Sequence, residues 1–481
     1  MPDLKPVLFV NGLVLLGLAA AMLVPVQVDL SYGRSEWTVF AGTAALTCFV
    51  GVCLTLVSRS RRPQLKLRQA FVLTTTVWIV IAAFSALPFH LSSLNLSLTD
   101  SFFEAVSGIT TTGSTVIVAL ETVSPGILIW RAMLQWLGGI GVIVTAISIL
   151  PMLRVGGMQL FKVEAFEADK VLPRAKQIAL EILFAYALIS AVAALTYYLL
   201  GMSGFDAVAH AMTTVATAGY STRDASFAAF NSASLEWAAS LFMILGSIPF
   251  VLYLRALHGS LRPLFRDQQV RGMLLIMAIA ILSLTLWLLL QLDMPFMEGL
   301  RHATFNAISI MTGTGFASAP FDQWGDFALG IFFLLMFIGG CAGSTSCGIK
   351  VFRFQILYET AKTQLRRLMQ PSGVFLTYYN GRPVTEQIAG SVMSFFFLFL
   401  FFFSMLSVLL GALGLDFLTS ISAAASAMAN VGPGLGPVVG PGGSFASLPD
   451  AAKWLLAAGM LLGRLEIFTV LVLFMPSFWR G

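Results

Sequence analysis

Four short glycine-containing loops hold the residues of this sequence that are best suited to chemistry. Residues 110–114 read TTTGS, 216–220 ATAGY, 312–316 TGTGF and 429–433 ANVGP. Glycine adopts positive φ without strain and lets other backbone approach closely. Backbone carbonyls gathered on one axis can replace the hydration shell of a bare cation. The pattern therefore predicts binding of a monovalent cation by main-chain oxygens.

The loops align on a glycine, and the spacing of these glycines indicates a repeat. Gly113, Gly219, Gly315 and Gly432 are 106, 96 and 117 residues apart, which is typical of a repeated supersecondary unit. One such loop alone is more simply a tight turn or a helix-packing site, but four at matching positions favour a filter. The predicted cation ligands, mainly through carbonyls, are Thr111, Thr112, Gly113, Thr217, Ala218, Gly219, Gly313, Thr314, Gly315, Asn430, Val431 and Gly432.

Composition requires a lipid environment for the elements that position these loops. Hydrophobic residues make up 58% of the 481 residues and charged residues 11%, whereas soluble domains carry about 25% charge. Crossing a bilayer takes roughly 20 apolar residues in a helix. Spans are predicted at 6–26, 36–57, 70–89, 127–150, 177–200, 234–254, 272–292, 327–342, 386–413 and 452–475.

Each glycine loop follows an apolar stretch that is too short to cross a membrane. These stretches, at 98–109, 205–215, 296–310 and 417–428, are predicted to be re-entrant half-helices. Their C-terminal, negative ends would approach the loops, which favours a cation.

The predicted fold is therefore an all-α polytopic membrane protein. Four pseudo-repeats of helix, re-entrant half-helix, filter loop and helix surround one pore, and two extra transmembrane helices precede them. The predicted boundaries are 1–60 for the extra helices, 68–155, 175–258, 270–370 (with an intramembrane gating loop) and 384–478 for the repeats.

Charge distribution predicts the orientation. The loops 58–69, 151–176 and 255–271 and the segment 350–382 hold 20 of the 28 basic residues, so the positive-inside rule places them and both termini in the cytoplasm. Acidic residues in the outer segments are expected to concentrate cations at the mouth. They are Asp100, Glu104, Asp206, Glu298, Asp322, Asp326 and Asp416.

A gate is predicted below the filter. Residues 339–348 read GGCAGSTSCG, and so many glycines would break the last helix of the third repeat. Arg464 is a charge inside the final span, where it is expected to face the pore opposite this segment and to repel cations. The alternatives are a small-residue packing patch, a structural partner for Arg464, and a plain membrane-surface anchor for Lys350. The gate residues are Gly339, Gly340, Gly343, Ser344, Thr345, Ser346, Gly348, Lys350 and Arg464.

The chain resembles the Trk/Ktr/HKT superfamily of potassium transporters, and most of all its bacterial TrkH/TrkG branch. The resemblance spans nearly the whole chain and is most specific in SGITTTGSTV (107–116), TAGYST (217–222), MTGTGFAS (311–318), GGCAGSTSCGIKVFRF (339–354) and GRLEIFTVLVLF (463–474). Ser346 and Cys347 depart from it, since the family usually has glycines there.

This resemblance implies gated, channel-like uptake of potassium across the bacterial inner membrane. Symport is expected, and the sequence does not identify the ion that would be coupled to potassium. It implies a homodimer in the lipid bilayer, a pore in each subunit, and a cytoplasmic TrkA-type nucleotide-binding subunit. We expect this chain to bind no nucleotide and no nucleic acid, and potassium to be its transported ion. Glycine at all four filter positions goes with potassium preference in the family, and a sodium-permeable or sodium-coupled transporter of the same fold is the alternative. An enzyme is not expected, because no acid–base pair or metal motif lies in the spans.

Overall fold

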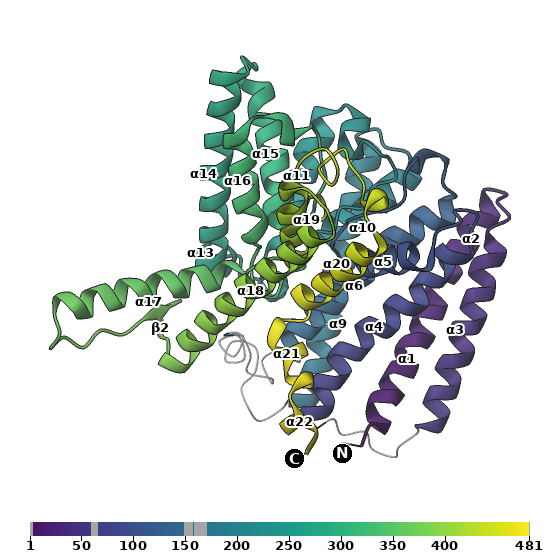
Figure 1. The fold of residues 1–481 in the computed structure, drawn as a ribbon, viewed down its shortest axis with the longest axis horizontal. Coiled ribbons are helices and arrows are strands. Elements are labelled where there is room, and N and C mark those ends of the chain that lie inside the picture. Colours follow the sequence, from purple (N-terminus) through teal and green to yellow (C-terminus); the bar gives the residue numbers. More distant parts are fainter. Residues whose placement is uncertain (1–2, 59–65, 149–156, 158–170, 481) are drawn as a thin grey trace.

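The computed structural model describes residues 3–58, 66–148, 157 and 171–480. Apart from the short hairpin of β1 (Tyr378–Tyr379) and β2 (Arg382–Pro383), regular structure in this part of the chain is helical. The predicted basic residues Arg59, Arg61, Arg62, Arg154, Lys162 and Lys170, and the predicted repeat boundary at 155, lie outside the described residues. The chain termini lie at the same end of the molecule (Figure 1).

In the part of the chain that the structure describes, seven helical segments are long and apolar enough to cross a membrane. The first consists of α1 (Lys5–Ala21) and α2 (Leu23–Ser31), and the next is α3 (Trp37–Val57). The others are α4 (Leu67–Leu91), α6 (Pro125–Ser148), α9 (Val171–Leu199), α14 (Gln268–Gln291) and α18 (Glu386–Ala412). Each coincides with a predicted span.

The remaining three predicted spans are not continuous helices, which corrects the prediction. The stretch 234–254 is divided into α11 (Ala233–Ser247) and α12 (Phe250–Leu257), bent by 93°. The stretch 452–475 is divided into α20 (Asp450–Arg464) and a second segment, bent by 110° from it, that consists of α21 (Ile467–Leu471) and η6 (Val472–Phe474). The stretch 327–342 is helical only as α16 (Asp326–Phe337). Pro249 lies at the first break, where it has no N–H to donate to the preceding turn of α11.

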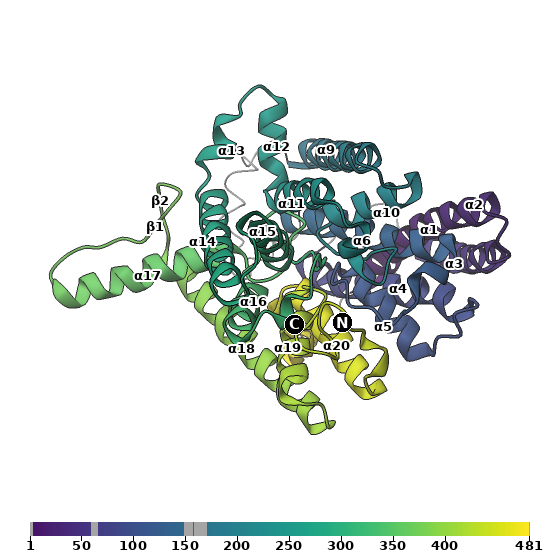
Figure 2. The ribbon, with the colours of Figure 1, turned by 90° about the horizontal axis from the view of Figure 1, so that it is seen from above.

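Four shorter helices match the predicted half-helices. They are α5 (Leu98–Ile109), α10 (Gly204–Val215), α15 (Phe296–Thr312) and α19 (Phe417–Ala429). Side-chain oxygens of Ser97, Ser203 and Asp416 accept backbone N–H bonds at the starts of α5, α10 and α19, which satisfies donors that a helix start leaves free. Seen from above, the half-helices lie toward the middle of the bundle (Figure 2).

Glycines let the second long helix of three repeats pack tightly against the half-helix ends. A Cβ built on Gly138 would lie 2.0 Å from Ile109 O, one on Gly246 2.8 Å from Val215 O, and one on Gly463 2.1 Å from Met428 O. In each case the carbonyl belongs to the residue four positions before the aligned glycine. The same helix–half-helix contact therefore recurs in repeats one, two and four.

The extra N-terminal helices are joined to the first repeat by a buried carboxylate. Asp29 in α2 accepts hydrogen bonds from Ser124 Oγ (2.6 Å) and Gly126 N (2.7 Å) at the start of α6. A carboxylate at a helix N-terminus satisfies free N–H groups there.

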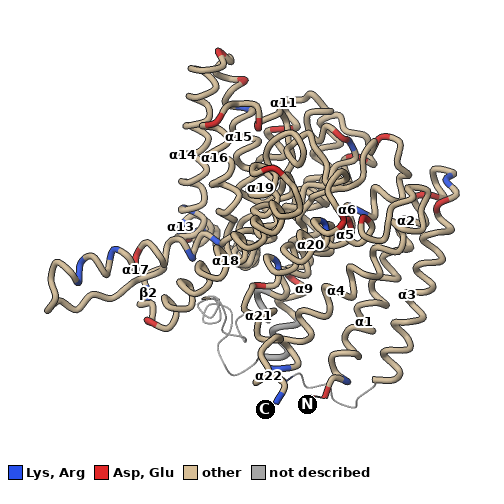
Figure 3. The backbone as a smooth tube through the Cα atoms, in the orientation of Figure 1, with Lys and Arg blue, Asp and Glu red and all other residues tan. Residues whose placement is uncertain are grey.

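The third repeat extends away from the bundle. After α16 the chain forms a non-helical loop and then α17 (Val351–Met369), which projects with the β1–β2 hairpin beyond the other helices (Figures 1 and 2). Lys and Arg residues occur along α17 and near the chain termini (Figure 3). Further short α-helices among the described residues are α13 (Arg262–Arg266) and α22 (Pro476–Arg480). Short 3₁₀ helices are η1 (Leu120–Thr122), η3 (Ser226–Phe230), η4 (Phe321–Gln323) and η5 (Phe445–Ser447).

Candidate functional site

All four half-helices end in the same backbone motif. The N–H of the residue before each aligned glycine bonds a carbonyl five residues back: Thr112 to Ser107, Ala218 to Thr213, Thr314 to Ser309 and Val431 to Ser426, at 2.8–3.0 Å. The preceding residue has positive φ in every loop, at Thr111 (55°), Thr217 (48°), Gly313 (74°) and Asn430 (53°). This is the Schellman pattern of helix ends. The aligned glycines also have positive φ, of 78–109°.

The four loops close into a ring. A Cβ built on Gly113 would lie 2.3 Å from Ala218 O, one on Gly219 1.8 Å from Thr314 O, one on Gly315 2.4 Å from Val431 O, and one on Gly432 2.8 Å from Thr112 O. Each glycine thus faces the carbonyl that precedes the glycine of the next loop, and the fourth faces the first. No residue with a side chain fits these positions without moving a neighbouring loop.

Polar side chains hold the ring together. Ser114 Oγ donates to Gly432 O (2.6 Å), and Asn430 Nδ2 donates to Thr112 Oγ1 (2.8 Å), so loops one and four are joined directly. Gln135 of α6 donates to Ala218 O (2.6 Å) and accepts from Tyr220 N (2.9 Å). The twelve predicted ligand residues therefore lie in one assembly at the centre of the protein.

A buried ion pair supports the first two loops from outside. Arg131 Nε lies 2.8 Å from Glu104 Oε1, and both side chains are at most 2% exposed. The guanidinium also donates to Ser221 O and Thr115 Oγ1, and lies 4.0 Å from the centroid of the Tyr220 ring. The Tyr220 hydroxyl donates to Glu104 O (2.9 Å).

Sequence reasoning missed Arg131, although the signal was available. It is a charge within the predicted span 127–150, and the argument that singled out Arg464 applies to it equally.

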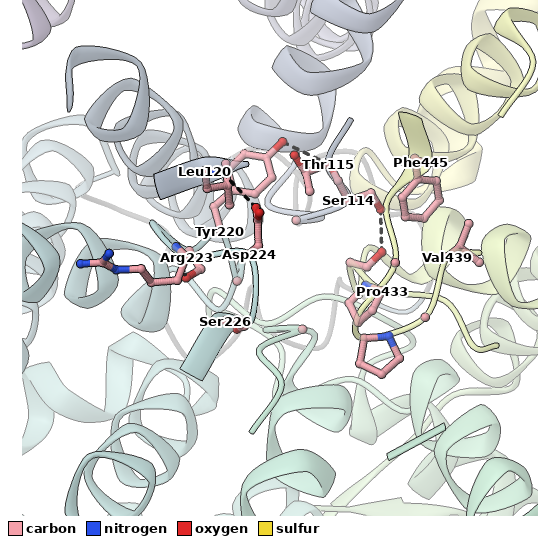
Figure 4. Close-up of a pocket in the computed structure, with 18 of the residues that line it drawn as sticks. Ser114, Thr115, Leu120, Tyr220, Arg223, Asp224, Ser226, Pro433, Val439 and Phe445 are labelled. Atoms are coloured by element: carbon pink, nitrogen blue, oxygen red, sulfur yellow. Dashed lines mark hydrogen bonds between the residues drawn. The ribbon is translucent and has the colours of Figure 1, made fainter. Parts of the chain in front are cut away.

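A cavity lies on one side of the ring and is lined by all four aligned glycines (Figure 4). Asp224 lies on its wall and accepts from Leu120 N (3.0 Å), whereas the Arg223 side chain points away from it. Asp224 is the one acidic residue among those described that lines this cavity, and it is not one of the acidic residues predicted to concentrate cations at the mouth.

The predicted acidic residues serve mainly as partners and helix caps. Asp100 pairs with Lys453 (2.6 Å), Glu104 with Arg131, and Asp206 with Arg223 (3.0 Å). Hydrogen bonds from Thr419 lower the pKa of the Asp416 carboxyl, while burial raises that of Asp322. Asp326 and Glu298 lie in the first turns of α16 and α15.

The predicted gate residues form a loop on the other side of the ring. Residues 339–348 are non-helical, and the loop is closed at its base by Gly339 N to Ile349 O (3.0 Å) and Ile349 N to Phe337 O (3.0 Å). Lys350 Nζ donates to Ser346 O within it. Lys350 therefore contacts the loop itself.

Arg464 contacts this loop from the end of α20. Its guanidinium lies 3.4 Å from Thr345 O and contacts Cys347 Sγ, while its Nε is buried without a hydrogen bond among the described residues. Glu466, two residues further along the chain, does not pair with Arg464 but bonds Arg353 (2.6 Å). A second cavity is lined by the loop, Asn430 and Arg464.

Comparisons with known proteins cover nearly the full chain. The family model described as "TrkH: Cation transport protein" matches residues 36–480. The chain is 48% identical over 477 residues to the Trk system potassium uptake protein TrkI of Halomonas elongata, covering 99% of this chain and 97% of that protein. It is 36% identical to TrkH of Escherichia coli K12, covering 98% of each. The crystal structure of the potassium transporter TrkH from Vibrio parahaemolyticus matches with a TM-score of 0.92, 33% identity and full coverage of both chains.

Removal of the Arg131 charge is expected to destabilise the protein strongly. Arg131→Met leaves Glu104 buried and unpaired, which should lower the free energy of unfolding by about 3–5 kcal/mol. The double variant Arg131→Met/Glu104→Gln should recover a large part of this loss, because no charge is left buried. Thermal unfolding in detergent measures both. A single variant as stable as the unaltered chain would contradict the proposed role of the ion pair.

Proposed function

Because the chain belongs to the TrkH family of cation transport proteins, we propose that it moves potassium through a gated, channel-like pore whose filter is the ring of four glycine loops. It is a potassium uptake transporter of the Trk type, as its relatives' names state of them. The ring is the observation that carries the proposal. It brings Thr112 O, Ala218 O, Thr314 O and Val431 O next to the glycines of neighbouring loops.

Backbone carbonyls select a cation by replacing its hydration shell. Of the predicted ligand residues none is charged, so attraction comes from carbonyl dipoles and from the C-terminal ends of α5, α10, α15 and α19. In this proposal potassium is the transported cargo, held mainly by Thr111–Gly113 and their counterparts in the other loops. A sodium-permeable pore of the same fold is the alternative, and ion competition separates the two.

The orientation is part of the proposal. The cavity that is lined by the four aligned glycines and Asp224 faces the outside of the cell. The gate loop, α17 and both termini lie on the cytoplasmic side of the bacterial inner membrane. Positive charge along α17 supports this assignment (Figure 3). A TrkA-type nucleotide-binding subunit would dock on this face, and the coupling of uptake to a second ion, as in symport, belongs to the same proposal.

The gate is the loop 339–348 with Lys350 and Arg464. The loop lies under the ring, and the Arg464 guanidinium contacts it within the second cavity, which the loop, Asn430 and Arg464 line. A fixed positive charge at this place repels a cation that leaves the filter, because screening is weak away from bulk water. Opening requires the loop and Arg464 to move off the axis.

The homodimer would form through the projecting third repeat. Leu368, Met369 and Val374 at the end of α17 and beyond are 78%, 82% and 91% exposed. Apolar side chains grouped at a projecting tip favour burial by a partner. We propose that a second copy of the chain covers them.

Light scattering of the detergent-solubilised protein should therefore give two chains per particle. The variant Leu368→Asp/Met369→Asp should shift the population toward one chain, because burying two carboxylates at the contact is unfavourable. Single chains throughout for the unaltered protein would refute the dimer.

Rubidium uptake into proteoliposomes tests the filter. Uptake by the unaltered chain should be blocked by excess potassium and much less by sodium. Gly219→Ala should reduce uptake by at least about tenfold, because the added Cβ meets Thr314 O and the backbone has positive φ. Gly201→Ala is the matched control, since Gly201 has φ of 104° but no heavy atom within 4 Å of a built Cβ.

Equal block by sodium and potassium would favour the sodium-permeable alternative. Equal uptake by the two alanine variants would show that the ring is not the path of the ion.

Neutralising Arg464 should increase uptake. Arg464→Ala removes the charge next to the gate loop, and rubidium flux without any regulator should rise by roughly tenfold. Arg464→Lys keeps the charge and should stay near the unaltered flux. If both variants transport like the unaltered chain, with or without the regulatory subunit, Arg464 has no part in gating.

A further inference from the structure

Three consecutive side chains of the gate loop contact three of the four filter loops. Thr345 reaches the second loop, Ser346 the third and Cys347 the first. The last two residues are those in which the sequence departs from the resembled family. Their contacts link the position of the gate loop to the geometry of the filter loops.

Ser346 connects the gate loop to the third filter loop. Its Oγ donates to Thr312 O (2.6 Å) and accepts from Gly340 N (2.8 Å). Thr312 ends α15 and directly precedes Gly313, where the backbone has positive φ. The Ser346 hydroxyl therefore bonds the filter backbone at the residue before its turn.

Cys347 connects the gate loop to the first filter loop. Its Sγ lies 3.3 Å from Thr111 Oγ1, and both residues are at most 4% exposed. A Cβ built on Gly313 would lie 3.2 Å from Cys347 Cβ, so the same residue packs against the third loop as well. Thr345 Oγ1 accepts from Thr217 Oγ1 (3.2 Å) in the second loop.

These contacts exist only while the loop is docked. When the loop moves, Thr312 O and Thr111 Oγ1 lose partners in a buried place, which is unfavourable unless the filter rearranges. Thr111 and Gly313 are also predicted potassium ligands. An ion that holds their backbone in one geometry thereby favours the docked loop, and by reciprocity the docked loop favours that ion.

We propose that Ser346 and Cys347 are positioning residues that couple the gate to the filter, so that potassium in the filter stabilises the docked, closed gate loop. This inference rests on the proposed function and adds a regulation of the same site. A pore coupled in this way closes more firmly when potassium occupies its inner end.

Cys347 supplies the readout, because docking hides its thiol between the loop and the filter. The experiment uses the full chain with Cys48, Cys53 and Cys341 replaced by alanine, and measures the rate of N-ethylmaleimide addition to Cys347 by intact mass. The rate of addition in sodium should exceed that in potassium by about fivefold, which is the change expected from the net contribution of one hydrogen bond to docking of the loop.

Ser346→Ala should raise the rate in potassium and reduce the dependence on the ion to less than about twofold. Ser346→Gly lacks the same hydroxyl and should behave alike. Ser344→Ala is the matched control, because the Ser344 hydroxyl donates to Cys341 O inside the loop (2.7 Å) and its removal should leave the ion dependence intact. A residue that merely stabilised the fold would change thermal unfolding without changing the ion dependence.

An ion-independent rate in the unaltered background, or equal behaviour of Ser346→Ala and Ser344→Ala, would overturn the coupling. Rubidium uptake by the same preparations separates this from the proposed function. If potassium blocks uptake but the rate of maleimide addition does not depend on the ion, the coupling alone is refuted. If potassium does not block uptake, both the potassium filter and the coupling are refuted.

Discussion

The close approach of a carbonyl to a glycine, repeated four times around a closed ring, is the contact on which the rest of the structure depends. Each aligned glycine meets the carbonyl before the glycine of the next loop, from Gly113 to Ala218 and finally from Gly432 to Thr112. A ring closed in this way fixes each loop against two others, so a displacement in one repeat reaches all four. The half-helices and the glycines that pack on their ends exist to deliver these loops to one centre, since irregular backbone at membrane depth must be enclosed by protein.

The backbone of the ring repeats, but its side-chain support does not. Arg131, Glu104 and Gln135 brace the first two loops, while Ser114 and Asn430 join the first to the fourth. Charge is distributed with the same asymmetry: the Arg131–Glu104 pair is neutral overall and lies beside the ring, whereas the Arg464 guanidinium lies beneath it without a carboxylate partner among the described residues. A paired charge supports structure, and an unpaired one changes the potential that an ion meets.

Sequence reasoning predicted the four shorter helices and the helix break within 339–348, because each leaves a local pattern of apolar length and glycine spacing. The four-fold repeat and the gate stay predictions. Sequence reasoning did not identify what depends on contacts between distant segments. Thr111, Thr217 and Asn430 have positive φ. Asparagine is enriched at positive φ, but threonine in a sequence gives no indication of it. The break at Glu466, which has φ of 64° and bonds Arg353, resembles an ordinary apolar span in sequence. The outer acids were expected to concentrate cations at the mouth, whereas Asp100 is paired with Lys453, which lies 353 positions further along the chain.

The three broken spans meet at the segment 339–348. At the first bend, Ser247 O accepts from Cys341 N (3.1 Å) and Phe250 N donates to Gly343 O (2.9 Å), so backbone groups released by the break are satisfied by the loop. The break after Phe337 is the loop itself, and the last bend ends α20 at Arg464, which contacts the loop from the neighbouring fourth repeat. A helix interrupted inside a membrane must find partners for its free backbone groups. Here the bend at Ser247–Phe250 and the segment 339–348 supply each other's backbone partners, so the break in the second repeat and the break in the third stabilise one another.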